Sequence, residues 1–196
     1  MIRSINLFAE DSAHEIFISA LLKRFSDDYA IEAILRPFSV RGGYGKAITE
    51  LRQYIRDVRV HRLVRADLLI VAIDANCKGY IERKREIDRV TEESGERIVC
   101  AIPDPHIERW LLLDSSAFKQ ALGKGCQAPD LKCDRDRYKK LLLQAVVEAN
   151  ITPLLGGVEH AAAIVDAMDL QRMEVVDNSL GKLLQELRTE FKQWQS

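Results

Sequence analysis

The chain has 196 residues, of which 47% are hydrophobic and 30% charged, and its net charge is −1. This length fits one domain, or one domain with a helical extension, and the composition is that of a compact protein with a real core. No apolar run approaches the roughly 18 residues needed to cross a bilayer. The first residues resemble a strand rather than a signal peptide. We therefore expect no membrane association and a cytoplasmic location.

The first half of the sequence alternates strand and helix patterns. We expect strands over residues 2–9, 31–38, 68–73 and 98–102, with a helix after each of the first three. A glycine-rich loop is expected over 41–46, before a helix that runs to about residue 64. The run at 68–73 is continuously apolar, as in a parallel strand buried on both faces. This order predicts an α/β three-layer sandwich around a central, mainly parallel, four-stranded sheet of the Rossmann-like kind.

The second half of the sequence is predicted to be helical. Apolar periodicity indicates helices over 106–122, 135–150, 158–168 and 180–194, with a loop over 123–133. We therefore assign residues 1–115 to the α/β domain and residues 116–196 to a helical extension that packs on the same core. The four cysteines form no CxxC pair and no zinc-binding spacing, so reduced thiols are expected.

Acidic residues follow three of the four predicted strands. Glu10 follows the first, Asp74 follows the third with Asn76 two residues on, and Asp104 follows the fourth with Glu108 one turn into the next helix. In open parallel sheets, ligands bind beyond the carboxyl ends of the strands. Hard cations such as Mg²⁺ take one or two carboxylates together with waters and substrate phosphates. The pattern is suggestive of a metal site.

Most of these acids also have structural interpretations. Ser12 and Glu15 have the spacing of a capping box at a helix start. Asp104 precedes a proline, as a helix N-cap often does. Glu108 in a first helical turn would favour the helix dipole without any metal. Only Glu10 and Asp74 lack such an alternative, since each directly follows an apolar strand.

Positive charge is concentrated between residues 36 and 65. Eight basic and two acidic side chains give this segment a charge of +6, so the remainder carries −7. The segment is either a phosphate-facing surface or an ordinary solvated helix face. Its glycine-rich loop fails the Walker pattern, because Ala47 stands where Ser or Thr would hold Mg²⁺. A plain loop and an anion-binding loop both remain open.

The order of these motifs resembles the TOPRIM domain of topoisomerases, primases and OLD-type nucleases. In that family a strand ends in Glu, and a later strand ends in Asp-x-Asp; here the segments are LFAED with Glu10 and LLIVAIDAN with Asp74 and Asn76. The segment PDPHIERWLLLD is similar to a motif of small stand-alone OLD-like TOPRIM proteins, some of them encoded beside ATPases in bacterial defence loci. The resemblance covers roughly the first 115 residues.

The resemblance implies a nuclease that depends on Mg²⁺ or Mn²⁺ and acts as an effector of an anti-phage defence or toxin-like system. Glu10 would act as base or ligand, and Asp74 and Asn76 would hold metal with Asp104 or Glu108. Nucleic acid would be the substrate, and an ATPase would be a possible partner protein. The chain could also form a homo-oligomer. The backbone of the nucleic acid would be bound by Arg41, Lys46 and Arg52.

Two departures from the family pattern qualify this expectation. Asp11 replaces the usual glycine, and Asn76 replaces the second Asp of the pair, so a neutral oxygen stands in for a charged one. Asp11, Glu108 or Asp114 could restore the missing charge. The alternative is a non-catalytic binding or regulatory subunit of an ATPase-containing complex, in which the acids are structural.

Overall fold

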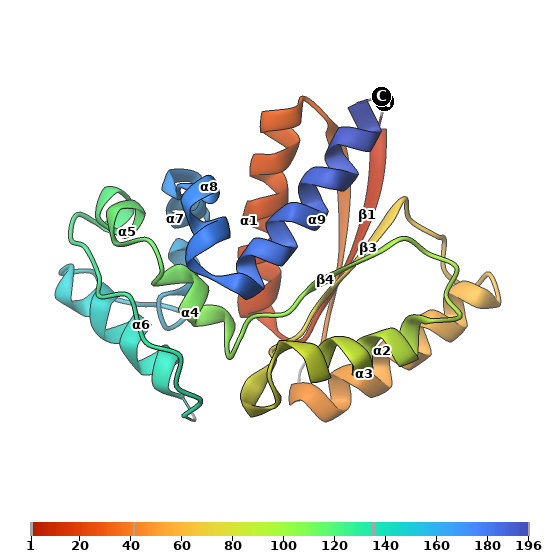
Figure 1. The fold of residues 1–196 in the computed structure, drawn as a ribbon, viewed down its shortest axis with the longest axis horizontal. Coiled ribbons are helices and arrows are strands. Elements are labelled where there is room, and N and C mark those ends of the chain that lie inside the picture. Colours follow the sequence, from red (N-terminus) through yellow and green to blue (C-terminus); the bar gives the residue numbers. More distant parts are fainter. Residues whose placement is uncertain (1, 41, 135, 196) are drawn as a thin grey trace.

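The structure is a computed structural model that describes residues 2–40, 42–134 and 136–195. Its sheet has four parallel strands in the order β2-β1-β3-β4 (Figure 1). The strands are β1 (Ile2–Ala9), β2 (Glu32–Ser39), β3 (Leu68–Ala72) and β4 (Ile98–Ala101). The expected α/β fold with a parallel four-stranded sheet is confirmed.

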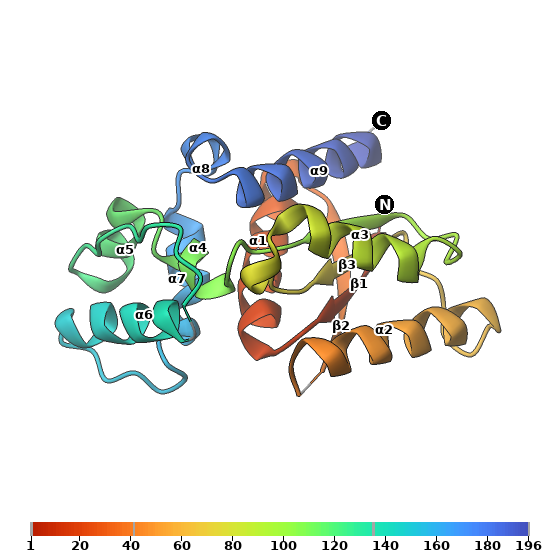
Figure 2. The same cartoon turned by 60° about the horizontal axis from the view of Figure 1, so that its bottom comes forward.

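Helices cover both faces of the sheet and make it the middle of three layers. The helices α1 (Ser12–Tyr29) and α9 (Asn178–Gln195) lie on one face, and α2 (Gly43–Arg59) and α3 (Tyr80–Thr91) lie on the other (Figures 1 and 2). Successive strand residues point to opposite faces. Leu7 accordingly enters the core under α1, whereas Phe8 enters the core under α2.

The remaining helices form a lobe beside the sheet (Figure 1). They are α4 (Ile107–Leu111), α5 (Ser115–Leu122), α6 (Arg137–Glu148), α7 (Ala161–Ala167) and α8 (Leu170–Val176), with single 3₁₀ turns at η1 (Asn76–Lys78) and η2 (Val158–His160). Trp110, Ile164 and Leu184 are fully buried in the same hydrophobic cluster as Leu7. The lobe and the α1 face of the sheet therefore share one core.

Several predicted helix limits are wrong. The helix expected over 106–122 is interrupted at Asp114, whose side chain accepts the backbone N–H groups of Ser116 and Ala117 and so starts α5. The predicted loop over 41–46 overlaps α2, which begins at Gly43 and ends at Arg59. Helix α8 was not predicted. The side chains of Asp114 and Asp169 cap the starts of α5 and α8, and apolar periodicity does not register such caps.

The start of α1 also differs from the predicted capping box. Asp11, not Ser12, is the N-cap, and its carboxylate accepts the backbone N–H groups of Ala13 and His14. Glu15 is instead the acceptor for the hydroxyl of Ser39. The cap is thus formed by the residue that directly follows Glu10.

The cysteines are not all reduced. Cys77 and Cys133 form a disulfide with a Cα–Cα distance of 5.4 Å, which corrects the expectation of free thiols for this pair, whereas Cys100 and Cys126 are free. The bond joins η1 to the segment before α6. Among the described residues, no helix combines the length and the hydropathy that crossing a membrane requires.

Candidate metal centre

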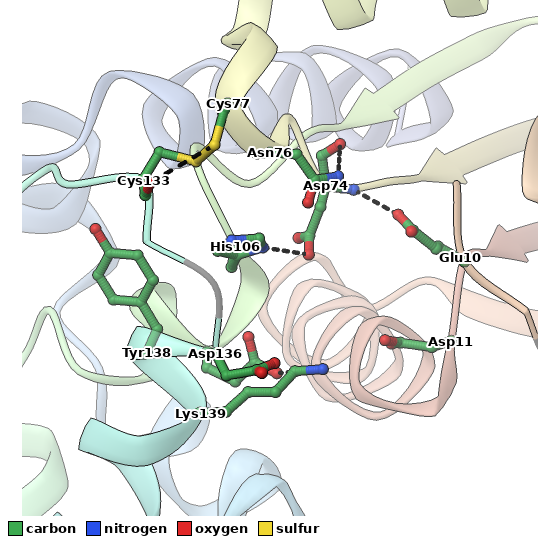
Figure 3. Close-up of a pocket in the computed structure, with 12 residues that line it drawn as sticks. Glu10, Asp11, Asp74, Asn76, Cys77, His106, Cys133, Asp136, Tyr138 and Lys139 are labelled. Carbon is green, nitrogen blue, oxygen red and sulfur yellow. Dashed lines mark hydrogen bonds and ion pairs between the residues drawn. A yellow bond between two sulfur atoms is a disulfide. The ribbon is translucent and has the colours of Figure 1, made fainter. Parts of the chain in front are cut away.

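A cavity of about 420 Å³ opens at the carboxyl ends of β1 and β3 (Figure 3). The two strands are parallel neighbours with Ala9 opposite Ala72, so the residues that follow them meet at one edge of the sheet. Glu10 and Asp74 therefore converge, and the Glu10 carboxylate accepts the backbone N–H of Asp74 at 3.0 Å. Both residues are buried: Glu10 is 8% exposed to solvent and Asp74 is 9% exposed.

Asp74 is the best-connected carboxylate of the cavity. Its Oδ1 lies 3.0 Å from Nε2 of His14 and accepts the backbone N–H of Ile107 at 2.9 Å, while its Oδ2 lies 3.0 Å from Nδ1 of His106. Burial opposes ionisation here, but the charge of His14 and the hydrogen bond from His106 outweigh it and lower the pKa of Asp74. Asp74 is therefore held as a carboxylate.

His14 bridges two carboxylates from a fully buried position. Its Nδ1 lies 2.8 Å from Oδ1 of Asp11, and its Nε2 faces Asp74. Ionised carboxylates only accept hydrogen bonds, so both ring nitrogens must carry a proton. Burial alone would favour the neutral ring, yet the charge of Asp74 and the bond to Asp11 raise the pKa of His14 well above its ordinary value. The side chain is an imidazolium that donates twice.

Glu10 and Glu108 are the less satisfied acids. Burial raises the pKa of both, and the negative charge of Asp74 raises each further. Glu108 is 3% exposed, and its buried Oε2 has no hydrogen-bond partner. The other oxygen of Glu108 lies 4.0 Å from Nζ of Lys139. A buried carboxylate oxygen without a partner is costly unless a cation or a proton binds it.

The donor chemistry of the cavity suits a hard divalent cation. Ligand atoms of Glu10, His14 and Asp74 all lie within 4.8 Å of one another. Because His14 donates through both nitrogens, it has no lone pair to offer, and the ligands must be carboxylate oxygens. Glu10 and Asp74 could supply them, and Glu108 lines the same cavity. An all-oxygen set favours Mg²⁺ or Mn²⁺ over softer metals.

Of the other two predicted ligands, Asn76 lies in the cavity wall and Asp104 does not. Asn76 lines the cavity, and its amide nitrogen lies 3.4 Å from the carbonyl oxygen of Asp74, which leaves its side-chain oxygen as the atom able to coordinate. Asp104 is absent from the cavity lining, and its carboxylate accepts the backbone N–H of Tyr80 at 3.2 Å. It does not cap the helix that follows, because His106 occupies the N-cap of α4.

Two of the three basic residues predicted to bind nucleic acid lie away from the cavity wall. Lys46 and Arg52 are exposed on α2, and neither lines the cavity, although Gly43 at the start of that helix does. Arg41 lies outside the described residues. The lysine that does line the cavity is Lys139 of α6.

Two features of the site were missed by sequence reasoning. His106 lies within the segment PDPHIERWLLLD, which was noticed as a motif, but its ring was given no role. Lys139 belongs to an amphipathic helix far along the chain, and no sequence pattern around it indicates a role in the site. Asp114, considered as a replacement acid, is outside the cavity lining, where it caps α5 and pairs with Arg172.

Comparison with known proteins adds a family but no activity. A family model described as a domain of unknown function, DUF4276, matches residues 9–188, a span that includes strands β2 to β4, the lobe and every residue of the candidate site. No curated protein and no solved structure matches the chain. Since the model covers most of the sequence, the chain belongs to the DUF4276 family.

Proposed function

We propose that this protein is a divalent-metal-dependent nuclease that hydrolyses phosphodiester bonds, and that it serves as an effector of a bacterial defence or toxin-like system. The observation that carries the proposal is the convergence of Glu10 and Asp74 with the partnerless Oε2 of Glu108 around one cavity at the carboxyl edge of the sheet. The order of Glu10, Asp74 and Asn76 along the chain, which resembles the TOPRIM pattern, supports the same chemistry.

Glu10 and Asp74 would hold Mg²⁺ or Mn²⁺, with Asn76 as an additional neutral ligand. A bound divalent ion would lower the pKa of a water molecule and neutralise charge that develops on a phosphodiester. The residues fit this role because their carboxylates face a cavity open to substrate. The positive charge of His14 offsets part of the negative charge of the carboxylates around the cavity.

The protein's own side chains would position the reacting groups. His14 and His106 hold the Asp74 carboxylate in one orientation through both oxygens. Oε2 of Glu108 is free to accept a proton from an attacking water, and its raised pKa suits a general base. The ammonium of Lys139, beside Glu108, can bind a non-bridging phosphate oxygen.

Thermal melting with and without divalent metal tests the metal site. A ligand that binds only the native state stabilises it, by about 2.7 kcal/mol at a concentration one hundred times its dissociation constant. We expect Mg²⁺ and Mn²⁺ to raise the melting temperature and Glu10→Gln to abolish the rise. The glutamine side chain can still accept the Asp74 N–H, so this variant should fold. Glu92→Gln, at an exposed position beyond α3, is the charge-matched control.

Cleavage assays test the catalytic step. Wild-type protein should cut DNA or RNA in Mn²⁺ or Mg²⁺, Glu92→Gln should cut equally, and Glu10→Gln should be inactive. Equal absence of cleavage for wild type and Glu10→Gln, alone and with an ATPase partner from the same locus, would refute catalysis.

A second candidate is a non-catalytic binding or regulatory subunit of an ATPase-containing complex. It is favoured by the full engagement of both Asp74 oxygens with donors of the chain, which can make this acid structural. The neutral Asn76 in place of a second acid points the same way. This candidate predicts no effect of divalent metal on melting and a higher melting temperature with the ATPase partner.

A further inference from the structure

A groove of about 360 Å³ continues from the candidate metal centre along α6. The two hollows share Asp11, Glu108 and Lys139 in their walls, so a bound chain could pass from one into the other. Beyond the shared residues, the groove is lined by Lys140 and Leu143 of α6, by the start of α1 and by residues 155–158 at η2. It is therefore the natural extension of the site along a polymeric substrate.

The groove combines positive charge with apolar surface. Lys139 and Leu143 are four residues apart and lie on one face of α6, and Lys140 is next to them. Leu143 and Leu155 are 41% and 60% exposed, although both line the groove. Within the described part of the chain, no carboxylate lies within ion-pair distance of the Lys140 ammonium. Exposed apolar side chains beside an available cation are typical of a ligand site rather than of an inert surface.

A nucleotide matches this combination. Its phosphate would meet the ammonium groups of Lys139 and Lys140, while its base or sugar would cover the leucine side chains. Among the described residues that line the groove, Asp11 and Glu108 are the acids that could repel a phosphate. A purely apolar peptide would leave the two lysines unused.

The depth of the carboxylates indicates what kind of nucleic acid can enter. Glu10, Asp74 and Glu108 are each at most 9% exposed and lie within the cavity. A rigid duplex cannot bring its backbone to recessed groups without losing base pairs, whereas an unpaired strand can bend and splay its bases. Binding in the groove then positions the nucleotide next to the cleaved bond.

We infer that the groove formed by Lys139, Lys140, Leu143 and Leu155 binds the flanking nucleotide of a single-stranded nucleic acid, so that the substrate is an unpaired strand or end. This inference rests on the proposed nuclease function, since it identifies the substrate of that site. The contacts to phosphate and to the base are separable, because they come from different side chains.

Binding in EDTA tests the inference without cleavage. Fluorescence anisotropy with labelled DNA and RNA strands of about 12 nucleotides, and with the matching duplexes, measures affinity at several salt concentrations. Wild-type protein should bind the single strands at least about tenfold more tightly than the duplexes. Comparison of the affinities for the DNA and RNA strands shows whether the protein prefers deoxyribose or ribose.

Three variants separate the contacts. Lys140→Gln should weaken single-strand binding about fivefold and make the slope of log affinity against log salt shallower by about 0.7. Leu143→Gln should weaken binding to a similar extent with the slope unchanged, because it removes an apolar contact. Lys192→Gln, at an exposed position on α9, is the matched control and should change neither. Unchanged melting temperatures would show that all three variants fold.

Wild-type affinity in both groove variants, tight binding of duplex, or no binding of any oligonucleotide would overturn the inference. A dimer that dissociates in Leu143→Gln while oligonucleotides fail to bind would also overturn it and assign the groove to a second copy of the chain. Single-strand binding that depends on the groove, together with no effect of divalent metal on melting, would refute the nuclease while retaining the groove.

Discussion

Nε2 of His14 lies 3.0 Å from Oδ1 of Asp74, and the opposite ring nitrogen lies 2.8 Å from Oδ1 of Asp11. One fully buried imidazolium thereby joins the N-cap of α1 to the carboxylate that follows β3. The bridge both fixes the geometry of the candidate site and compensates the buried carboxylate of Asp74 and the partly exposed carboxylate of Asp11. It is the contact through which the stability of the fold and the arrangement of the site depend on one another.

Replacing His14 should therefore destabilise the protein. His14→Asn shortens the side chain and leaves the buried carboxylate of Asp74 without this cation, and breaking a buried pair costs about 3 to 5 kcal/mol. Urea unfolding measures the difference. His61→Asn makes the same chemical change at an exposed position and should cost less than about 0.5 kcal/mol. Equal losses in the two variants would contradict the bridge.

The disulfide should contribute measurably to stability. Cys77 and Cys133 are separated by 56 residues, and closing a loop of this size is worth about 4 kcal/mol. The double variant Cys77→Ser, Cys133→Ser should lose this amount at constant pH and no longer respond to dithiothreitol. Cys126→Ser, which removes a free thiol, should keep the wild-type response. Titration of four free thiols in the denatured, non-reduced wild type would refute the bond.

Asp114 should make stability depend on pH in the acid range. Burial opposes its ionisation, but the hydrogen bond from Arg172 and the capped backbone N–H groups lower its pKa below the ordinary 3.8. A lowered folded-state pKa gives stability that is present above pH 3.8 and is lost as pH falls through the folded-state value.

Unfolding of Asp114→Asn compared with wild type tests this at pH 7 and at pH 3. The asparagine side chain can still cap α5 but cannot pair with Arg172 as an anion, so we expect a loss of about 1.5 to 3 kcal/mol at pH 7 that shrinks towards pH 3. Asp166→Asn, on the exposed face of α7, should show no such difference. If Asp114→Asn lost more stability relative to the wild type at pH 3 than at pH 7, the predicted direction of the pH dependence would be wrong.

Arg83 should not tolerate lysine. Its Nε donates to the carbonyl oxygen of Asp74 at 2.8 Å, and its guanidinium lies 3.5 Å from the ring centroid of Tyr44, all within a nearly fully buried site. A lysine keeps the charge but loses the flat stacking surface and the second donor. We expect Arg83→Lys to cost about 2 kcal/mol in thermal unfolding, and the exposed Arg85→Lys almost nothing. An Arg83→Lys variant as stable as the wild type would show that stacking on Tyr44 contributes little to stability.

The sequence by itself determined the layers of the fold and the position of two acids. The run from Leu68 is apolar without alternation, as in a strand buried on both faces, and Glu10 and Asp74 each follow a strand of this parallel sheet. Parallel strands end at the same edge of a sheet, so the sequence placed both carboxylates at that edge. That they meet there depends on the strand order, in which β1 and β3 are neighbours.

Only the tertiary structure decided how the site is completed. His106 reaches Asp74 from the start of α4, Lys139 reaches the cavity from α6, and Cys77 meets Cys133 across 56 residues of sequence. Hydrophobic periodicity and capping patterns report contacts within a few residues. Which distant side chains meet depends on how the lobe packs against α1, and that packing has no local signature in the chain.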